Sequence, residues 1–248
     1  MKLFRKARFF WVYPLVAALF LTAATSEASL RLGSVLVLLG EALRLWADGF
    51  VGHVKVNFTQ RWRNDPKIGR LITGGPYAYV RHPLYVGTFL IGAGFCAATK
   101  SLPLTAAALA FFLLVYRKKA EREEQIILGE WGEEYAKYQR LVPRWLPAFR
   151  RYPHRHGRWS WKGINASREW KTLIWVIVAL LALYLREEWF IEHDVFGEHR
   201  WLKQALLASA AVALMATDGL IELVRRRRKA RAAAPPRAAQ TEAFYGAR

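Results

Sequence analysis

Six apolar segments alternate with polar and basic stretches along the chain. A membrane-spanning helix needs about 17–25 mostly apolar residues, and the first two segments and the last supply that length. The third and fourth are shorter and are separated only by Thr99, Lys100 and Ser101, so they predict a tight helical hairpin, either spanning or buried in the bundle. Because lipid cannot satisfy free backbone groups, helices are the expected elements. The pattern predicts an all-α fold, a polytopic membrane helical bundle of about six transmembrane helices. The segments are Phe9–Thr25, Leu30–Trp46, Pro83–Ala98, Leu102–Tyr116, Trp170–Leu185 and Trp201–Val224.

The chain is strongly basic, with 38 Lys and Arg residues against 19 Asp and Glu residues and a formal net charge of +19. Of these 38, 32 lie in residues 1–8, 51–83, 117–171 and 225–248, whereas the connections on the other side hold five. Lys and Arg gather on the cytoplasmic side of membrane proteins, so both termini and both long connections are predicted to be cytoplasmic. The charge therefore reflects membrane topology. It predicts contact with membrane lipids and no nucleic-acid partner.

The order of the segments divides the chain into four parts. Residues 1–50 hold two transmembrane helices, 51–150 the hairpin and two informative cytoplasmic segments, 151–224 the last two helices, and 225–248 a basic, disordered tail. Residues 1–28 also resemble a signal peptide, whose removal would leave the other helices oriented as before. The single cysteine, Cys96, excludes a disulfide framework and a cysteine-based zinc site, and no metal is expected. The Ala- and Arg-rich composition favours a prokaryotic inner membrane.

The first informative cytoplasmic segment reads LITGGPYAYVRHPLYVG over residues 71–87. Gly-Gly-Pro predicts a turn, and Pro83 suits the first turn of a helix. Arg81 and His82 are therefore expected at the mouth of the third helix, where an anionic group is favoured, with Tyr85 one turn inside. Tyr79 and Tyr85 add aromatic faces that can hold a cation or an adenine. An interfacial aromatic belt with a snorkelling arginine is the plainer alternative.

The second informative segment reads RKKAEREEQIILGEWGEEYAKY over residues 117–138 and continues the fourth helix into the cytoplasm. Helical spacing puts Arg117, Glu121 and Glu124 on one face and turns Glu123 away. Gly132 is predicted to end this helix, and a short helix follows. The sequence LVPRWLP at 141–147 then stops helix formation at the bilayer surface. A solvated charged face is the alternative interpretation.

The second apolar segment carries three ionisable residues, Glu41, Arg44 and Asp48, at spacings of three and four. Ionisable residues inside membrane helices are functional candidates. Because opposite charges alternate on one face, a self-neutralised stripe is favoured here over direct catalysis.

The motifs occur in the order GEALR, LITGGPY, RHPLYVG, a short hairpin, EREEQIIL, GEEYAKY and VPRWLP. In this order and spacing, from about Leu36 to Phe149, the chain resembles the isoprenylcysteine carboxyl methyltransferase family, which shares HP-x-Y with phospholipid methyltransferases. The resemblance implies an S-adenosylmethionine (SAM) cofactor, a helical membrane fold with no Rossmann domain, and a lipophilic acceptor that enters from the bilayer. The chain accordingly has no G-x-G-x-x-G after a predicted strand.

The resemblance also implies roles for single residues. The HP-x-Y positions are expected to line the cofactor pocket, one of the paired acids to engage polar groups of the cofactor, and the two later tyrosines to cap the pocket. A glycine lets the cofactor or a neighbouring helix approach, and two arginines are candidates for steering the acceptor or the methionyl carboxylate. The expected cofactor-binding residues are Tyr79, His82, Tyr85, Gly87, Glu123, Glu124, Tyr135 and Tyr138. The expected catalytic residues are Arg81, Arg117 and Glu124.

The expected function is SAM-dependent methyl transfer to a prenylcysteine-like carboxylate, a lipid amine or a small thiol. The donor is already activated, so the protein mainly supplies positioning and desolvation. A carboxylate needs no general base and is oriented by Arg, whereas an amine or thiol needs Glu or His to take a proton. Two helices follow the motif region, unlike in the eukaryotic prenylcysteine enzymes, which leaves room for another lipophilic acceptor. The alternatives are an NADPH-dependent membrane reductase of sterol-reductase type and a non-catalytic membrane scaffold.

Overall fold

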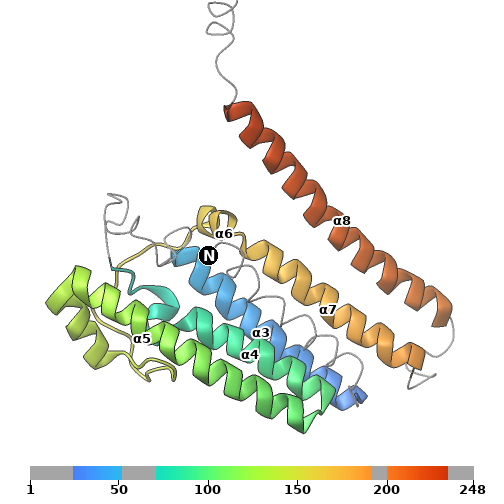
Figure 1. Cartoon of the computed structure of the whole chain (residues 1–248), viewed down its shortest axis with the longest axis horizontal. Coiled ribbons are helices and arrows are strands. Elements are labelled where there is room, and N and C mark those ends of the chain that lie inside the picture. The colour runs from blue at the N-terminus through green and yellow to red at the C-terminus, as the bar shows by residue number, and fades with distance from the viewer. Residues whose placement is uncertain (1–24, 52–70, 191–199, 234–248) are drawn as a thin grey trace, which may run out of the picture.

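The computed structural model describes residues 25–51, 71–190 and 200–233, and every regular element in these ranges is a helix (Figure 1). The all-α prediction is confirmed for this part of the chain, which contains no strand. Five of the six predicted apolar segments coincide with α-helices, while Phe9–Thr25 lies outside the described residues except for Thr25. The elements are α3 (Glu27–Val51), the 3-10 helix η1 (Gly75–Ala78), α4 (Pro83–Thr99), α5 (Leu102–Leu141), α6 (Trp161–Ser167), α7 (Glu169–Phe190) and α8 (Arg200–Ala233).

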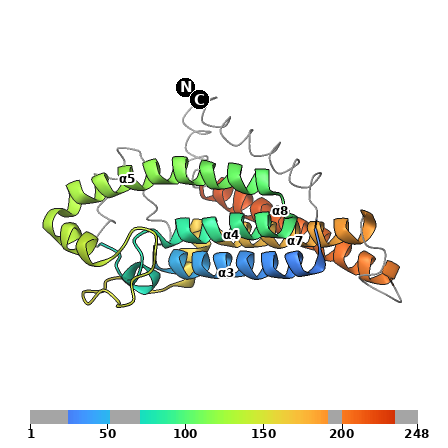
Figure 2. The same cartoon turned by 90° about the horizontal axis from the view of Figure 1, so that it is seen from below.

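Helices α3 and α4 lie side by side and approach closely through glycines (Figures 1 and 2). A Cβ atom on Gly40 would lie 2.7 Å from the carbonyl oxygen of Gly87, and one on Gly94 would lie 2.6 Å from that of Gly33. These distances leave no room for a larger residue, so small residues permit the contact. The two helices therefore run antiparallel, with the start of α4 held against the C-terminal half of α3 and its end against the N-terminal half.

Helices α4 and α5 form the predicted hairpin. Lys100 links them in the left-handed conformation, with φ 50°. Helix α5 extends well beyond its apolar part, and its backbone breaks at Gly132, where φ is 47° and ψ is −123°. Glycine adopts a positive φ without a Cβ clash. The predicted helix end at Gly132 and the short helical segment after it are therefore confirmed.

Helix α7 packs on α3, and α8 lies on the other side of α7 (Figure 1). The side chains of Val37, Val176 and Leu180 form a buried apolar cluster between α3 and α7. An ion pair joins α7 to α8, with Lys171 Nζ 3.2 Å from Asp218 Oδ1. The C-terminal helices are thus attached to the motif-bearing helices through α3.

Within the described ranges, one stretch is long and apolar enough to cross a membrane by length and composition, Gln204–Ile221 of α8. Helix α4 is apolar but has 17 residues. Helix α3 is long enough but carries Glu41, Arg44 and Asp48 in its interior. The predicted bundle of six spans is therefore not confirmed.

Candidate functional site

The turn before α4 places the first group of candidate residues. Gly75 adopts φ +60°, as the Gly-Gly-Pro turn requires. Helix α4 begins at Pro83, which needs no hydrogen-bond partner there, and His82 is the N-cap residue. Arg81 and His82 therefore lie at the mouth of α4 and Tyr85 lies one turn inside, as predicted.

The buried carboxylate of Glu124 lies at the centre of a cluster of nitrogen groups from two arginines and a histidine. Arg144 donates to it through Nε at 3.0 Å and Nη2 at 2.7 Å, while Arg81 Nη1 lies 3.1 Å and His82 Nε2 lies 3.0 Å from it. Burial alone would raise the pKa of Glu124. Hydrogen bonds from His82 and Arg144, together with the charge of Arg81, outweigh burial and lower this pKa from 4.5 to about 2. Glu124 is therefore an ionised anchor for three cationic or polar side chains.

Glu123 faces the other side of the His82 ring. It accepts a hydrogen bond from the hydroxyl of Tyr85, and its Oε2 lies 3.9 Å from His82 Nδ1. Burial raises the pKa of Glu123 above its usual value, against the hydrogen bond from Tyr85 and the charge of Lys119. The predicted divergence of the two acids is confirmed, and the imidazole of His82 lies between them.

Aromatic rings surround this imidazole. The rings of His82 and Tyr85 are parallel with centroids 5.2 Å apart, and the ring of Trp145 lies 5.7 Å from that of His82. Tyr116 meets Tyr85 edge to face at 4.9 Å. Lys119 Nζ lies 4.8 Å from the centre of the Tyr85 ring. The geometry shows that a cation can rest against these π-faces.

Tyr135 and Tyr138 lie in a separate aromatic core next to the cluster. Their ring centroids are 5.8 Å apart, and Tyr152 meets Tyr138 edge to face at 5.2 Å. The hydroxyl of Tyr138 donates to the carbonyl of Tyr77 at 2.7 Å, and Tyr79 packs against the same core. Burial raises the pKa of Tyr135 to about 12, with a contribution from the charge of Glu124. These tyrosines hold the end of α5 against the turn before α4.

Two further predicted site residues, Arg117 and Gly87, also lie apart from the cluster. The side chain of Arg117 is 74% exposed and pairs with Glu121 at 3.0 Å, one turn along the same helix. A Cβ atom on Gly87 would lie 2.5 Å from Cγ of Arg44 and 2.7 Å from the Gly40 carbonyl oxygen. Gly87 is expected to admit either the cofactor or a neighbouring helix, and the structure shows the close approach of a helix, α3.

Sequence reasoning did not single out Arg144 and Trp145, although the VPRWLP motif contains both. The chain turns back after α5 ends at Leu141, and the Arg81 amide donates to the carbonyl of Pro143 at 2.9 Å. This return brings Arg144 onto Glu124 and Trp145 onto His82. The useful signal was a basic and an aromatic residue between two prolines that stop the helix.

The expected self-neutralised stripe of α3 is present only in part, because Arg44 pairs with Glu41 in its own helix but more closely with Glu169 of another. Arg44 Nε donates to Glu169 of α7 at 2.6 Å, whereas its distance to Glu41 in the same helix is 3.8 Å. Arg44 also donates to the carbonyl of Leu84 at 3.3 Å and to the hydroxyl of Thr88, both in α4. Arg44 therefore connects three helices, because the nearest buried carboxylate comes from a distant part of the sequence.

The cluster contains groups of the kind that bind the polar parts of SAM, the cofactor that the family resemblance implies. Nε of Arg81 is buried and has no hydrogen-bond partner among the described residues, so it retains a donor for a carboxylate. Glu123 accepts a hydrogen bond from Tyr85 through Oε1, whereas Oε2 lies 3.9 Å from His82 Nδ1, beyond hydrogen-bond distance. Oε2 can therefore accept a hydrogen bond from an amine or a ribose hydroxyl. The rings of Tyr85 and Trp145 offer faces to a sulfonium. The described residues contain no group of His, Cys, Asp and Glu suited to hold a metal ion.

Comparison with known proteins gives matches to the same region. Residues 33–128 match the isoprenylcysteine carboxyl methyltransferase (ICMT) family. The chain is 32% identical over 127 residues to the cobalt-zinc-cadmium resistance protein CzcN of Cupriavidus metallidurans, covering 51% of this chain and 53% of that protein. It is 33% identical over 119 residues to protein-S-isoprenylcysteine O-methyltransferase of Homo sapiens, covering 46% of this chain and 40% of the human protein. No solved structure matches the chain.

The chain spans about half the length of the curated relatives it matches. The matched region contains α4, the apolar part of α5 and the two acids that flank His82. The resemblance to the isoprenylcysteine carboxyl methyltransferase family is therefore confirmed over residues 33–128.

Proposed function

We propose that this chain is an integral membrane methyltransferase that uses SAM and acts on a lipophilic acceptor. The observation that carries the proposal is the position of His82, between Glu123 and Glu124 and beside Arg81, at the mouth of α4. Buried acids, a guanidinium with a spare donor and aromatic faces match the amine, carboxylate and sulfonium of the cofactor. The match of residues 33–128 to the methyltransferase family supports the same function.

We further propose that the chain crosses a prokaryotic inner membrane as a six-span bundle with both termini cytoplasmic. Large apolar side chains face outward on α3, α5 and α8, the reverse of a soluble protein. Examples are Leu39 on α3, Leu114 on α5 and Leu220 on α8. An outward apolar surface of this kind needs lipid to cover it.

Within the site, Arg81, Glu123 and the aromatic rings bind and orient the cofactor. Glu124 holds Arg81, His82 and Arg144 in place, and Tyr135 and Tyr138 fix the segment that closes over them. When bound, SAM supplies a methyl group on a sulfonium, and the C–S electron pair stays on sulfur as the acceptor lone pair forms the new bond. The protein therefore contributes position and exclusion of water. Arg117 is assigned to acceptor steering, at the exposed edge of the site.

The acceptor determines whether a base is needed. A prenylcysteine carboxylate is already a nucleophile, and Arg orients it without proton transfer. A lipid amine or a thiol must lose a proton, for which His82 or Glu123 lies in place. The human relative is named for O-methylation of S-isoprenylcysteine, so a prenylcysteine is the first acceptor to test.

The test is transfer of a tritiated methyl group from SAM by the purified chain in detergent or nanodiscs. An S-farnesylcysteine analogue, phosphatidylethanolamine and a small alkyl thiol serve as parallel acceptors. We expect label in one lipophilic product, loss of that product in Glu123→Gln, and retention in Glu130→Gln, a matched change farther along the same helix. No label in any product, from protein shown to be folded, would refute the proposal.

A further inference from the structure

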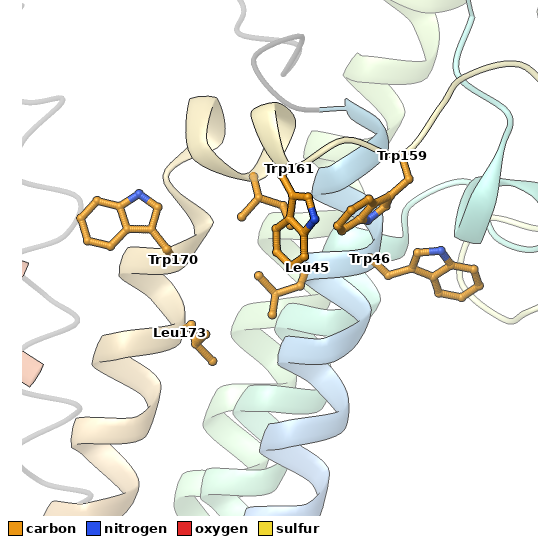
Figure 3. Close-up of a pocket in the computed structure, with 7 residues that line it drawn as sticks. Leu45, Trp46, Trp159, Trp161, Trp170 and Leu173 are labelled. Atoms are coloured by element: carbon orange, nitrogen blue, oxygen red, sulfur yellow. The ribbon is translucent and has the colours of Figure 1, made fainter. Parts of the chain in front are cut away.

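The molecule has a second candidate binding site, an apolar pocket on the face of α3 that α6 and α7 cover (Figure 3). Its volume is about 560 Å³, within the range of roughly 300–1,000 Å³ typical of ligand sites. Only leucine, isoleucine and tryptophan side chains line it. The labelled residues in Figure 3 are Leu45, Trp46, Trp159, Trp161, Trp170 and Leu173.

The wall of this pocket is held firmly to the end of α3. The amide of Ser160 donates to the carbonyl of Gly49 at 2.8 Å. A Cβ atom on Gly49 would lie 2.0 Å from the indole nitrogen of Trp159, so this indole rests directly on the helix backbone. Trp159 and Trp161 meet edge to face at 4.7 Å. The segment that carries Trp159 and Trp161 is therefore fixed to α3 by a backbone hydrogen bond and by ring packing.

The segment that supplies Trp159, Trp161 and Trp170 to the pocket is strongly basic. Residues 150–171 contain seven Lys and Arg residues and one acid, Glu169. That acid is buried and paired with Arg44, so it does not neutralise the surface. Arg158 and Lys162 each stand next to a pocket tryptophan in the sequence and are exposed. An apolar pocket with a cationic rim complements a ligand that has an apolar chain and an anionic head.

We propose that this pocket binds an acyl chain of an anionic glycerophospholipid from the cytoplasmic leaflet, with the phosphate beside Arg158 and Lys162. Tryptophan side chains are enriched at the level of lipid headgroups, and Lys and Arg near the cytoplasmic surface attract anionic lipids. The inference rests on the membrane placement proposed above and does not depend on methyl transfer. The bound lipid fastens α6 and the start of α7 to α3, next to the buried pair of Arg44 and Glu169.

The test is native mass spectrometry of the full chain in detergent, titrated with dioleoylphosphatidylglycerol or dioleoylphosphatidylcholine in the absence of SAM and acceptor. We expect one tight phosphatidylglycerol per chain and weaker binding of phosphatidylcholine. Lys162→Gln should weaken the binding of phosphatidylglycerol by about fivefold and leave the binding of phosphatidylcholine unchanged. Trp161→Ala should weaken the binding of phosphatidylglycerol by about threefold to tenfold.

Trp201→Ala is the matched control, because Trp201 on α8 is 72% exposed and Trp161 is 74% exposed. This control should bind phosphatidylglycerol as tightly as the unaltered chain does. Both Trp→Ala variants should fold, because the two rings are mostly exposed. Leu173→Trp fills the pocket and should abolish the tight site while leaving the basic rim intact. Equal affinity for the two lipids, or equal losses in Trp161→Ala and Trp201→Ala, would overturn the proposal. Displacement of phosphatidylglycerol by an S-farnesylcysteine analogue would also overturn it, because the pocket would then belong to the methyl acceptor.

Discussion

Replacing Glu124 by Gln removes the charge that holds Arg81, His82 and Arg144 together at the mouth of α4. Glu124 is 4% exposed, so water replaces little of what is lost. Its pKa is lowered from 4.5 to about 2, which corresponds to about 3 kcal/mol of stabilisation of the folded chain at neutral pH. We expect Glu124→Gln to lower the free energy of unfolding at pH 7 by about 3 kcal/mol, because buried cations lose their partner.

The sign of the pH dependence follows from the direction of this shift. The pKa of Glu124 is lower in the folded chain than in the unfolded chain, so its stabilisation is fully present above pH 4.5 and is lost as the pH falls towards 2. The difference in unfolding free energy between the unaltered chain and Glu124→Gln should therefore be largest near pH 7. It should shrink by more than half at a pH of about 3.

Denaturant unfolding in detergent micelles, followed by circular dichroism, measures this difference. Glu121→Gln is the matched control, since Glu121 lies 3.6 Å from Arg144 but its side chain is 39% exposed. We expect that control to change stability by less than about 1 kcal/mol. A difference for Glu124→Gln that stays constant with pH, or one no larger than that of Glu121→Gln, would refute the reasoning.

Three further predictions follow from named contacts. Glu169→Gln should lower the free energy of unfolding by about 3 kcal/mol, because the largely buried Arg44 would lose its nearest carboxylate and keep the more distant Glu41; an unchanged Tm would contradict this. Gly87→Ala should cost about 1–3 kcal/mol, because its Cβ atom meets the α3 backbone, whereas Gly92→Ala, whose Cβ atom meets nothing within 4 Å, should not destabilise the chain. Arg117→Gln should leave the Kd for SAM unchanged in isothermal titration, because the Arg117 side chain lies outside the cluster. A higher Kd would show that Arg117 contributes to cofactor binding.

The local features of the fold follow from the sequence. Pro83 predicts where α4 begins, and Gly132 predicts where α5 breaks, because each acts through its own backbone. The helical spacing of Glu121, Glu123 and Glu124 likewise predicts that Glu123 points to a different side of the helix from the other two. Each of these features depends on a few neighbouring residues, so it can be predicted from the local sequence.

The long-range contacts do not follow from the sequence. Nothing in the spacing of α3 indicates that Arg44 pairs with Glu169, 125 positions away. The placement of Arg144 on Glu124 depends on how the chain folds back after α5, which the proline-flanked motif allows but does not specify. The same holds for the tryptophan pocket, whose lining residues Trp46 and Trp170 come from α3 and α7, which are far apart in the sequence.

The central claim is that the cluster around His82 binds SAM, and calorimetric titration of the purified full chain in detergent tests it most directly. NADPH is the parallel ligand, and Glu123→Gln and Glu130→Gln are the paired variants. We expect saturable binding of SAM, no binding of NADPH, and weaker SAM binding in Glu123→Gln alone. Binding of NADPH without SAM would point to a reductase, and binding of neither ligand by folded protein would point to a non-catalytic scaffold; either result would contradict the account.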